Sequence, residues 1–199
     1  MLRRMRRLRL ASQAVVMISL VSLLTWAGPP ANAADHNCNE NNAGCVPDGG
    51  DHTWCDSVFF TFEDALMAAR EYALDNMVAQ TNYGRNHVGS YEGECPSSTD
   101  TYWIVDDSLG STRGYYQCKS FNDDGNCAHA WIRLNPDALT NTLNRRKTAC
   151  HELGHSLGLE HHPSPYGDCM MSGAVTSGHQ QYNSYHVARI NARSGDTGH

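Results

Sequence analysis

Apolar residues recur along the chain in patterns that predict helices and strands. Between residues 61 and 82 apolar side chains return at steps of three and four, which places them in one stripe along a helix. Thr61 is a fitting N-cap for this helix, and Asn82-Tyr83-Gly84 would end it. The stripe consists of Phe62, Leu66, Ala69, Ala73 and Met77.

Further elements follow in the second half of the chain. Runs of β-branched and aromatic residues predict strands over 101–105 and 128–134, and a shorter one over 115–118. Helices are predicted over 143–157 and 184–192, separated by a long loop. The apolar candidates of the last helix are Tyr185, Val187, Ala188 and Ile190.

Polar segments separate these elements. Residues 34–56 are rich in Asn, Asp and Gly and hold three cysteines, so we expect a loop pinned by disulfides. Residues 84–100 predict a second loop. The segment 122–126 could offer oxygen ligands to calcium, but it lacks the spaced acidic residues of a calcium loop, and a plain turn is favoured.

Residues 1–33 have the three-part pattern of an export signal peptide. Five arginines precede an apolar run, and a small-residue site follows it, with cleavage expected after Ala33. The run is shorter than the ~20 residues of a membrane-spanning helix and contains serines, which disfavours an anchor. Paired arginines leave a twin-arginine route open. No other segment could cross a membrane, so we expect no membrane contact after cleavage.

Removal of residues 1–33 changes the charge of the chain. The whole chain has 15 Lys and Arg against 21 Asp and Glu, a net charge of −6. The N-terminal segment holds five arginines and no acid, which leaves ten basic against 21 acidic residues, a net charge of −11. A body this acidic argues against a nucleic-acid partner, because such binding requires basic patches.

A group of closely spaced histidines indicates a metal-binding site. His151, Glu152 and His155 have the spacing H-E-x-x-H, and residues four apart lie on one helix face, so both imidazoles could hold one metal ion. Glu152 lies beside that face, placed to act on a metal-bound water. Gly158 tolerates the left-handed conformation that ends a helix, so the chain could reverse and bring His161 to the same ion. Three ligands and one open position are typical of catalytic zinc sites.

The extended pattern H-E-x-x-H-x-x-G-x-x-H resembles the long zinc-binding signature of the metzincin metalloproteases. Residues 151–159 are most similar to the matrixin branch and to small secreted bacterial proteases of that type. These proteases also carry a methionine-containing turn, which residues 168–173 would supply. Either Met170 or Met171 would lie beneath the zinc, and we favour Met170. Motif similarity covers residues 150–173.

The resemblance implies an α+β fold: a metzincin-like twisted mixed β-sheet, a long active-site helix, a methionine turn and a C-terminal helix. The catalytic domain would span residues 61–199, after a Cys-containing N-terminal segment at 34–60. An extended peptide substrate would lie along an edge strand, expected at 128–134, and residues 171–182 would wall the specificity pocket. We expect a monomer.

The resemblance further implies a secreted, extracellular zinc-dependent endopeptidase that acts on a peptide or protein substrate. His151, His155 and His161 would bind Zn²⁺, and Glu152 would be the general base toward a zinc-activated water. Two alternatives stay open. One is a secreted zinc-binding module without proteolytic turnover, which would not need Glu152, and the other is a hydrolase of cell-wall peptides.

The cysteines fit an exported chain. All eight follow residue 33, and an even number predicts up to four disulfides. Pairing of Cys150 with Cys169 would tie the active-site helix to the methionine turn, and pairing of Cys118 with Cys127 would close a short loop. Cys45 lies in a sequence similar to the inhibitory cysteine of matrixin propeptides, but too few residues precede it, and a disulfide is favoured. The order of pairing stays open for Cys38, Cys45, Cys55 and Cys95.

Overall fold

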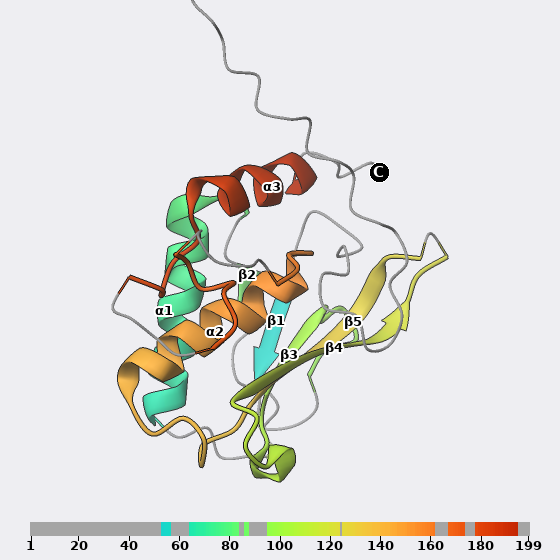
Figure 1. Cartoon of the computed structure of the whole chain (residues 1–199). Helices are drawn as coiled ribbons and strands as arrows, with labels where there is room; N and C mark the ends of the chain where they lie inside the picture. The colour runs from blue at the N-terminus through green and yellow to red at the C-terminus, as the bar shows by residue number, and fades with distance from the viewer. Residues whose placement is uncertain are drawn as a thin grey trace, which may run out of the picture. The chain divides into compact units, whose positions relative to one another are not determined.

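A five-stranded mixed β-sheet with the order β2-β1-β3-β5-β4 forms the framework of the fold (Figure 1). Its inner strands run parallel, whereas β4 is antiparallel to β5 and lies at the edge. The strands are β1 (Thr53–Asp56), β2 (Asn86–His87), β3 (Thr101–Val105), β4 (Gly114–Phe121) and β5 (Cys127–Leu134).

The helices complete an α+β fold, as the sequence predicts. They are α1 (Asp64–Gln80), α2 (Thr142–Ser156) and α3 (Ser184–Ser194), and a short 3-10 helix, η1, spans Asp107–Leu109. This computed structural model describes residues 53–56, 64–83, 86–87, 95–123, 125–161, 167–173 and 178–194, all within the unit Ala31–His199. The predicted signal peptide, Thr61, Phe62, Cys38 and Cys45 lie outside the described residues.

The core lies between the sheet and the two long helices. Helices α1 and α2 pack against each other, and α2 also packs against β4 and β5. The predicted stripe of α1 is confirmed, because its described members are all buried. Fully buried side chains from β1, β3 and β5 meet this stripe: Trp54, Trp103, Ile132 and Leu134.

The opposite face of β4 and β5 is only partly buried and carries cations over aromatic rings. The Nζ of Lys119 lies 4.4 Å from the centre of the Trp131 ring. The guanidinium of Arg133 lies over the rings of Trp131 and Tyr115 and pairs with Asp106. The two faces of the sheet therefore differ as the alternation of residues along a strand requires.

Three predictions about the strands are wrong. Residues 34–56 do not all form a loop, because β1 pairs with β3 inside the sheet, and the predicted loop at 84–100 contains the short strand β2. The predicted strand at 128–134 exists as β5, but it lies between β3 and β4 and is not an edge. The edge strand next to β5 is β4, which is longer than the expected 115–118, and β2 lies at the other edge.

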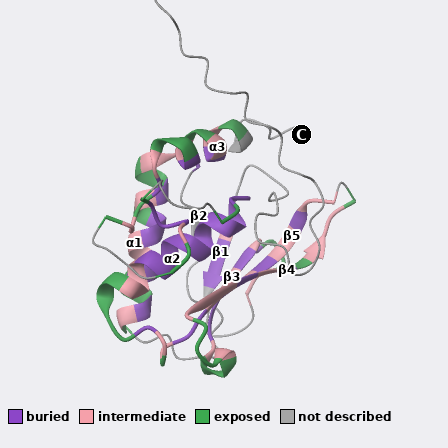
Figure 2. Cartoon of the chain, viewed as in Figure 1, coloured by how far each residue is buried: buried purple, intermediate pink, exposed green. Residues whose placement is uncertain are grey.

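Helix α3 is buried on a different face from the one its apolar residues suggest. Tyr185 and Ala188 are exposed, whereas Ile190 and the polar His186 are buried (Figure 2). The buried positions are four residues apart, as expected for one helix face. The reason for the buried histidine is its pairing with Asp168.

The structure contains three disulfides among the described residues. Cys150–Cys169 and Cys118–Cys127 confirm the predicted pairs, and Cys55–Cys95 joins β1 to the segment that precedes β3. Disulfides of this kind form in oxidising compartments. Within the described ranges, no helix has the length and apolar character needed to cross a membrane.

Two neighbouring residues of α1 test the assignment of its buried face. Leu66 is fully buried and Met67 is 37 % exposed. Leu66→Ala should lower the free energy of unfolding by about 2–5 kcal/mol, because it leaves a cavity in the core. Met67→Ala should lower it by less than about 1 kcal/mol. Urea unfolding of both variants measures the difference, and similar losses would contradict this packing.

Candidate metal centre

Helix α2 carries two of the three candidate ligands, and its ends are fixed locally. At its start the side chain of Asn141 accepts a hydrogen bond from the N–H of Asn144 at 2.9 Å, which caps the helix. From Lys147 to Ser156 every residue is buried (Figure 2). The two histidines of this helix, His151 and His155, are therefore held by the packing around the helix.

The end of α2 reverses the chain, as predicted from Gly158. This glycine has a φ of +80°, in the left-handed region. Its N–H bonds to the carbonyl of His155 at 3.0 Å, and the N–H of Leu159 bonds to the carbonyl of Gly154 at 2.9 Å. These two bonds form a Schellman motif, and the reversed chain brings His161 back to the helix.

The three predicted histidines converge. The Nε2 atom of His155 lies 3.2 Å from that of His151 and 3.1 Å from that of His161, and the third side of this triangle measures 3.0 Å. His151 and His155 are buried, while His161 is exposed. The structure thus joins residues from a helix and from the loop after it into one cluster.

The other ring nitrogens show which tautomer is present. The Nδ1 atom of His151 lies 2.7 Å from the carbonyl oxygen of Cys169, and that of His155 lies 2.7 Å from the carbonyl oxygen of Leu159. A carbonyl oxygen can only accept, so we assign the proton to Nδ1 in both rings. The Nε2 atoms of a neutral His151 and His155 are then both acceptors, and neither can donate to the other.

This donor set fits a metal ion. Burial, together with the charge of neighbouring groups, lowers the pKa of His151 well below its usual value and that of His155 to about 4, so both rings are neutral near pH 7. Two ligands about 2.0–2.1 Å from a tetrahedral zinc ion would be about 3.3 Å apart, close to the observed separations. The cluster of His151, His155 and His161 could therefore hold a metal ion.

Glu152 lies next to the cluster and is 6 % exposed. Burial raises the pKa of its carboxyl to about 8, against the lowering effects of the Lys147 ammonium and a hydrogen bond from the backbone of Tyr116. That bond comes from the edge strand β4, which approaches α2 closely. A Cβ atom added at Gly114 would lie 2.8 Å from Oε1 of Glu152 and 2.5 Å from Cγ2 of Thr148.

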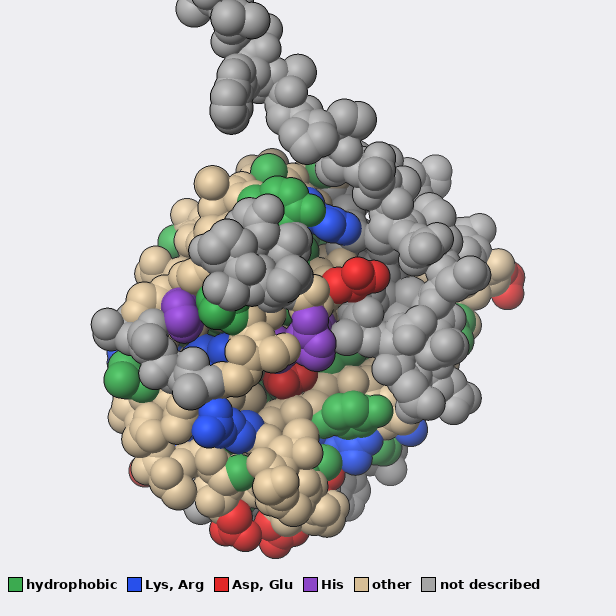
Figure 3. All heavy atoms as spheres, in the orientation of Figure 1, with side chains coloured by type: hydrophobic (Ala, Val, Ile, Leu, Met, Phe, Trp, Pro, Cys, Tyr) green, Lys and Arg blue, Asp and Glu red, His purple; other side chains and the backbone are tan. Residues whose placement is uncertain are grey.

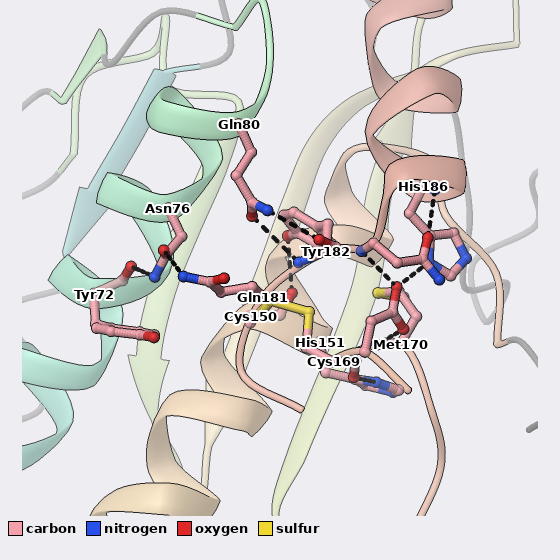
Figure 4. Close-up of a disulfide and its surroundings, with 12 residues drawn as sticks. Tyr72, Asn76, Gln80, Cys150, His151, Cys169, Met170, Gln181, Tyr182 and His186 are labelled. Atoms are coloured by element: carbon pink, nitrogen blue, oxygen red, sulfur yellow. Dashed lines mark hydrogen bonds and ion pairs between the residues drawn. A yellow bond between two sulfur atoms is a disulfide. The ribbon is translucent and has the colours of Figure 1, made fainter. Parts of the chain in front are cut away.

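The Cys150–Cys169 disulfide connects α2 to the turn that contains Met170 (Figure 4). The carbonyl of Cys169 is the one that accepts the bond from His151, so the bridge lies directly behind this ring. Met170 is fully buried, and a Cβ atom added at Gly154 would meet its thioether. The favoured methionine thus packs under α2 between the two ligand-bearing positions, while Met171 is only partly buried.

The buried pair of Asp168 and His186 supports this turn, and sequence reasoning missed it. The Asp168 carboxylate accepts bonds from the N–H of Met170 at 3.0 Å and of Asn183 at 3.1 Å, and it pairs with the His186 ring. Burial raises the pKa of Asp168, but these hydrogen bonds outweigh it and lower the pKa below its usual value. The sequence carries no spacing signal for the pair, because its members lie in different elements.

The cluster opens onto a cavity of about 410 Å³ that His151 and Glu152 both line. Figure 3 shows His and acidic side chains next to each other near the middle of the face drawn. Two cations that the sequence analysis passed over, Arg113 and Lys147, line the same cavity. Lys147 precedes His151 by four residues, so helix periodicity alone places both on one face.

Comparison with known proteins adds no relative. No protein-family model matches the chain, and a search of curated proteins finds no similar sequence.

One metal ion should bind through the histidine cluster. We expect Zn²⁺ to raise the thermal unfolding temperature of the chelator-treated protein, because an ion that binds only the folded state stabilises it. His155→Ala should lower the Zn²⁺ affinity by at least about 100-fold, while His129→Ala should leave it within about threefold. His129 is a matched control because it bonds to the carbonyl of Thr99 away from the cluster. Isothermal titration measures both, and equal affinities would exclude this cluster as the site.

The raised pKa of Glu152 predicts a pH-dependent stability of the metal-free protein. Between pH 4.5 and about 8 the folded chain keeps a proton that the unfolded chain releases, so rising pH favours unfolding. Glu152→Gln removes this titration. The variant should therefore gain stability relative to the wild type from pH 5 to pH 8, by an amount on the order of a few kcal/mol. Urea unfolding with chelator measures it, and parallel pH profiles would contradict the burial of a protonated carboxyl.

Proposed function

We propose that the chain is a secreted zinc-dependent endopeptidase of the metzincin type. The similarity of residues 150–173 to the long metzincin signature supports this proposal, and so does the fit of three histidines to one metal ion. The disulfides and the N-terminal signal pattern support export. Zinc is the ion best matched to three imidazoles and an open position.

One observation carries the proposal: a candidate ligand and a candidate base face the same open space. His151 and Glu152 are neighbours in the sequence, and both line the cavity described above. A structural metal site is closed by protein ligands on all sides. The open side of this cluster, with a carboxyl group next to it, is what a hydrolytic site requires.

The chemistry divides between the ion and Glu152. Zinc, when bound, supplies a Lewis acid that polarises a carbonyl group and increases the acidity of water. In the proposal the oxygen of the attacking water bonds to the carbonyl carbon, and the Glu152 carboxylate accepts a proton from this water at the same time. Glu152 then donates that proton to the nitrogen of the leaving amine when the C–N bond breaks.

The ionisation state of Glu152 depends on nearby positive charge. Without an ion, burial keeps its pKa near 8 and favours the protonated form, which cannot act as a base. An opposite charge a few ångströms away lowers the pKa of a carboxyl group. The site is therefore built to hold a working base only when it is loaded with metal.

The edge strand β4 is the proposed position for the substrate. It has no partner strand on its outer side within the described residues, so an extended peptide could add to the sheet there. Its first residue, Gly114, lines the cavity together with Glu152. Ser172 and Gly173 also line this cavity, and they belong to the segment expected to shape the specificity pocket.

Replacement of the proposed base separates an endopeptidase from a zinc-binding module without turnover. Glu152→Gln should keep Zn²⁺ bound but lower the rate of casein hydrolysis by at least about 100-fold, because no group then accepts the proton. Glu160 is a matched control, since it is exposed and close in sequence. Glu160→Gln should retain the wild-type rate.

The comparison needs the purified secreted protein, with and without chelator. Casein hydrolysis that persists in Glu152→Gln would exclude this residue as the base. A wild-type protein that binds Zn²⁺ but cleaves neither casein nor a peptide library would instead support the zinc-binding module. Cleavage restricted to cell-wall peptides would support the third interpretation.

A further inference from the structure

The cavity beside Glu152 is lined by charged and hydroxyl-bearing side chains. It carries two cations, the Glu152 carboxyl and several hydroxyl groups, and no large apolar side chain is among its described lining residues. The lining consists of Ser111, Arg113, Gly114, Lys147, Thr148, His151, Glu152, Ser172 and Gly173. An apolar side chain placed there would take two cations out of water, which is costly.

Lys147 is the central feature of this lining. Only 6 % of the surface of Lys147 is exposed, and this residue borders the cavity. Among the described residues no hydrogen bond or ion pair within 4.0 Å reaches its ammonium group. The residue is mostly buried, but its ammonium nitrogen is not among the fully buried unpartnered atoms, so this group is suited to a partner that enters the cavity from outside the chain.

The neighbouring charges indicate the sign of that partner. Burial lowers the pKa of Lys147, and the nearby Arg113 guanidinium lowers it further. The carboxyl groups of Glu152 and Asp168 act in the opposite direction and raise this pKa. Lys147 and Arg113 are thus close enough to repel each other. An anion placed between them would relieve this repulsion, and the hydroxyl groups of Ser111 and Thr148 could donate hydrogen bonds to it.

We propose that this cavity binds the side-chain carboxylate of a substrate Asp or Glu that lies next to the cleaved bond. The proposal rests on the proposed endopeptidase function and names the substrate class of the same site. Because His151 and Glu152 line the cavity, a group held there belongs to a residue that borders the reacting carbonyl. The two cations outnumber the single Glu152 carboxyl, so the cavity attracts an acidic group.

A simpler role for Lys147 is that of a counter-ion for Glu152. The ammonium does lower the pKa of that carboxyl, but the two groups form no ion pair within 4.0 Å. The two roles differ in their kinetics. A counter-ion changes the cleavage rate of every peptide by the same factor, whereas a binding group changes the ratio between acidic and neutral peptides.

The test uses two series of fluorogenic peptides, each varied at one residue on one side of the cleaved bond. The varied residue is Asp, Asn, Glu, Gln, Leu or Lys. In the wild-type protein we expect kcat/KM for the acidic peptide to exceed that of its amide analogue by at least about tenfold in one series. Lys147→Met should bring this ratio close to one, and Arg113→Gln should lower it.

A charge reversal and a matched control sharpen the result. Lys147→Glu should shift the preference from Asp or Glu to Lys. Arg146→Gln removes the same charge from the adjacent position, where the guanidinium stacks 4.3 Å from the Tyr72 ring centre, and it should leave the ratio unchanged. An acidic preference that is absent in the wild type, or that persists in Lys147→Met, overturns the proposal, and so does an equal loss of rate for all peptides.

A binding measurement separates this proposal from the proposed function. Zinc-loaded Glu152→Gln keeps peptides intact, so fluorescence anisotropy can compare its affinity for the acidic peptides and their amide analogues. Tighter binding of the acidic peptide that disappears when Lys147→Met is added supports the acidic-side-chain site, even if the wild type cleaves nothing. Equal affinity for both peptides in this variant overturns the site, whatever the wild type cleaves.

Discussion

Two hydrogen bonds to main-chain carbonyls determine the geometry of the candidate metal centre. The Nδ1 atoms of His151 and His155 donate to the carbonyls of Cys169 and Leu159, which turns both Nε2 lone pairs toward one point. Such lone pairs repel each other in the absence of a cation, so the rings must be held from behind. The disulfide behind Cys169 and the Schellman turn at Gly158 provide that support.

The edge strand imposes the second constraint on the site. Its close approach at Gly114 leaves no room for a side chain, and the backbone of Tyr116 holds the Glu152 carboxyl in place. Burial dominates the pKa of this group, and the neighbouring Lys147 offsets only a part of that effect. The fold thus places a carboxyl group where its charge depends on what binds beside it.

Local sequence signals predicted much of the fold and of the candidate site. The strand at 101–105 and helix α2 follow from short-range patterns, and the position of His161 follows from the glycine that ends this helix. The strand β1 escaped prediction because four residues carry too little periodicity, and its pairing partner β3 lies more than 40 residues away. The order of the strands could not be predicted either. The sequence pattern of β5 predicts a strand, but it is the same for a strand inside a sheet as for a strand at its edge.

The sequence by itself determined the ligand types, their spacing on one helix face and the turn that returns His161, because each depends on neighbours within a few residues. Only the tertiary structure decided the ring tautomers, the edge strand, the pairing of Asp168 with His186 and the burial of Lys147. These features depend on hydrogen-bond partners and packing surfaces that come from distant parts of the chain. No local pattern encodes such contacts, because the contacts exist only once the sheet and helices have come together.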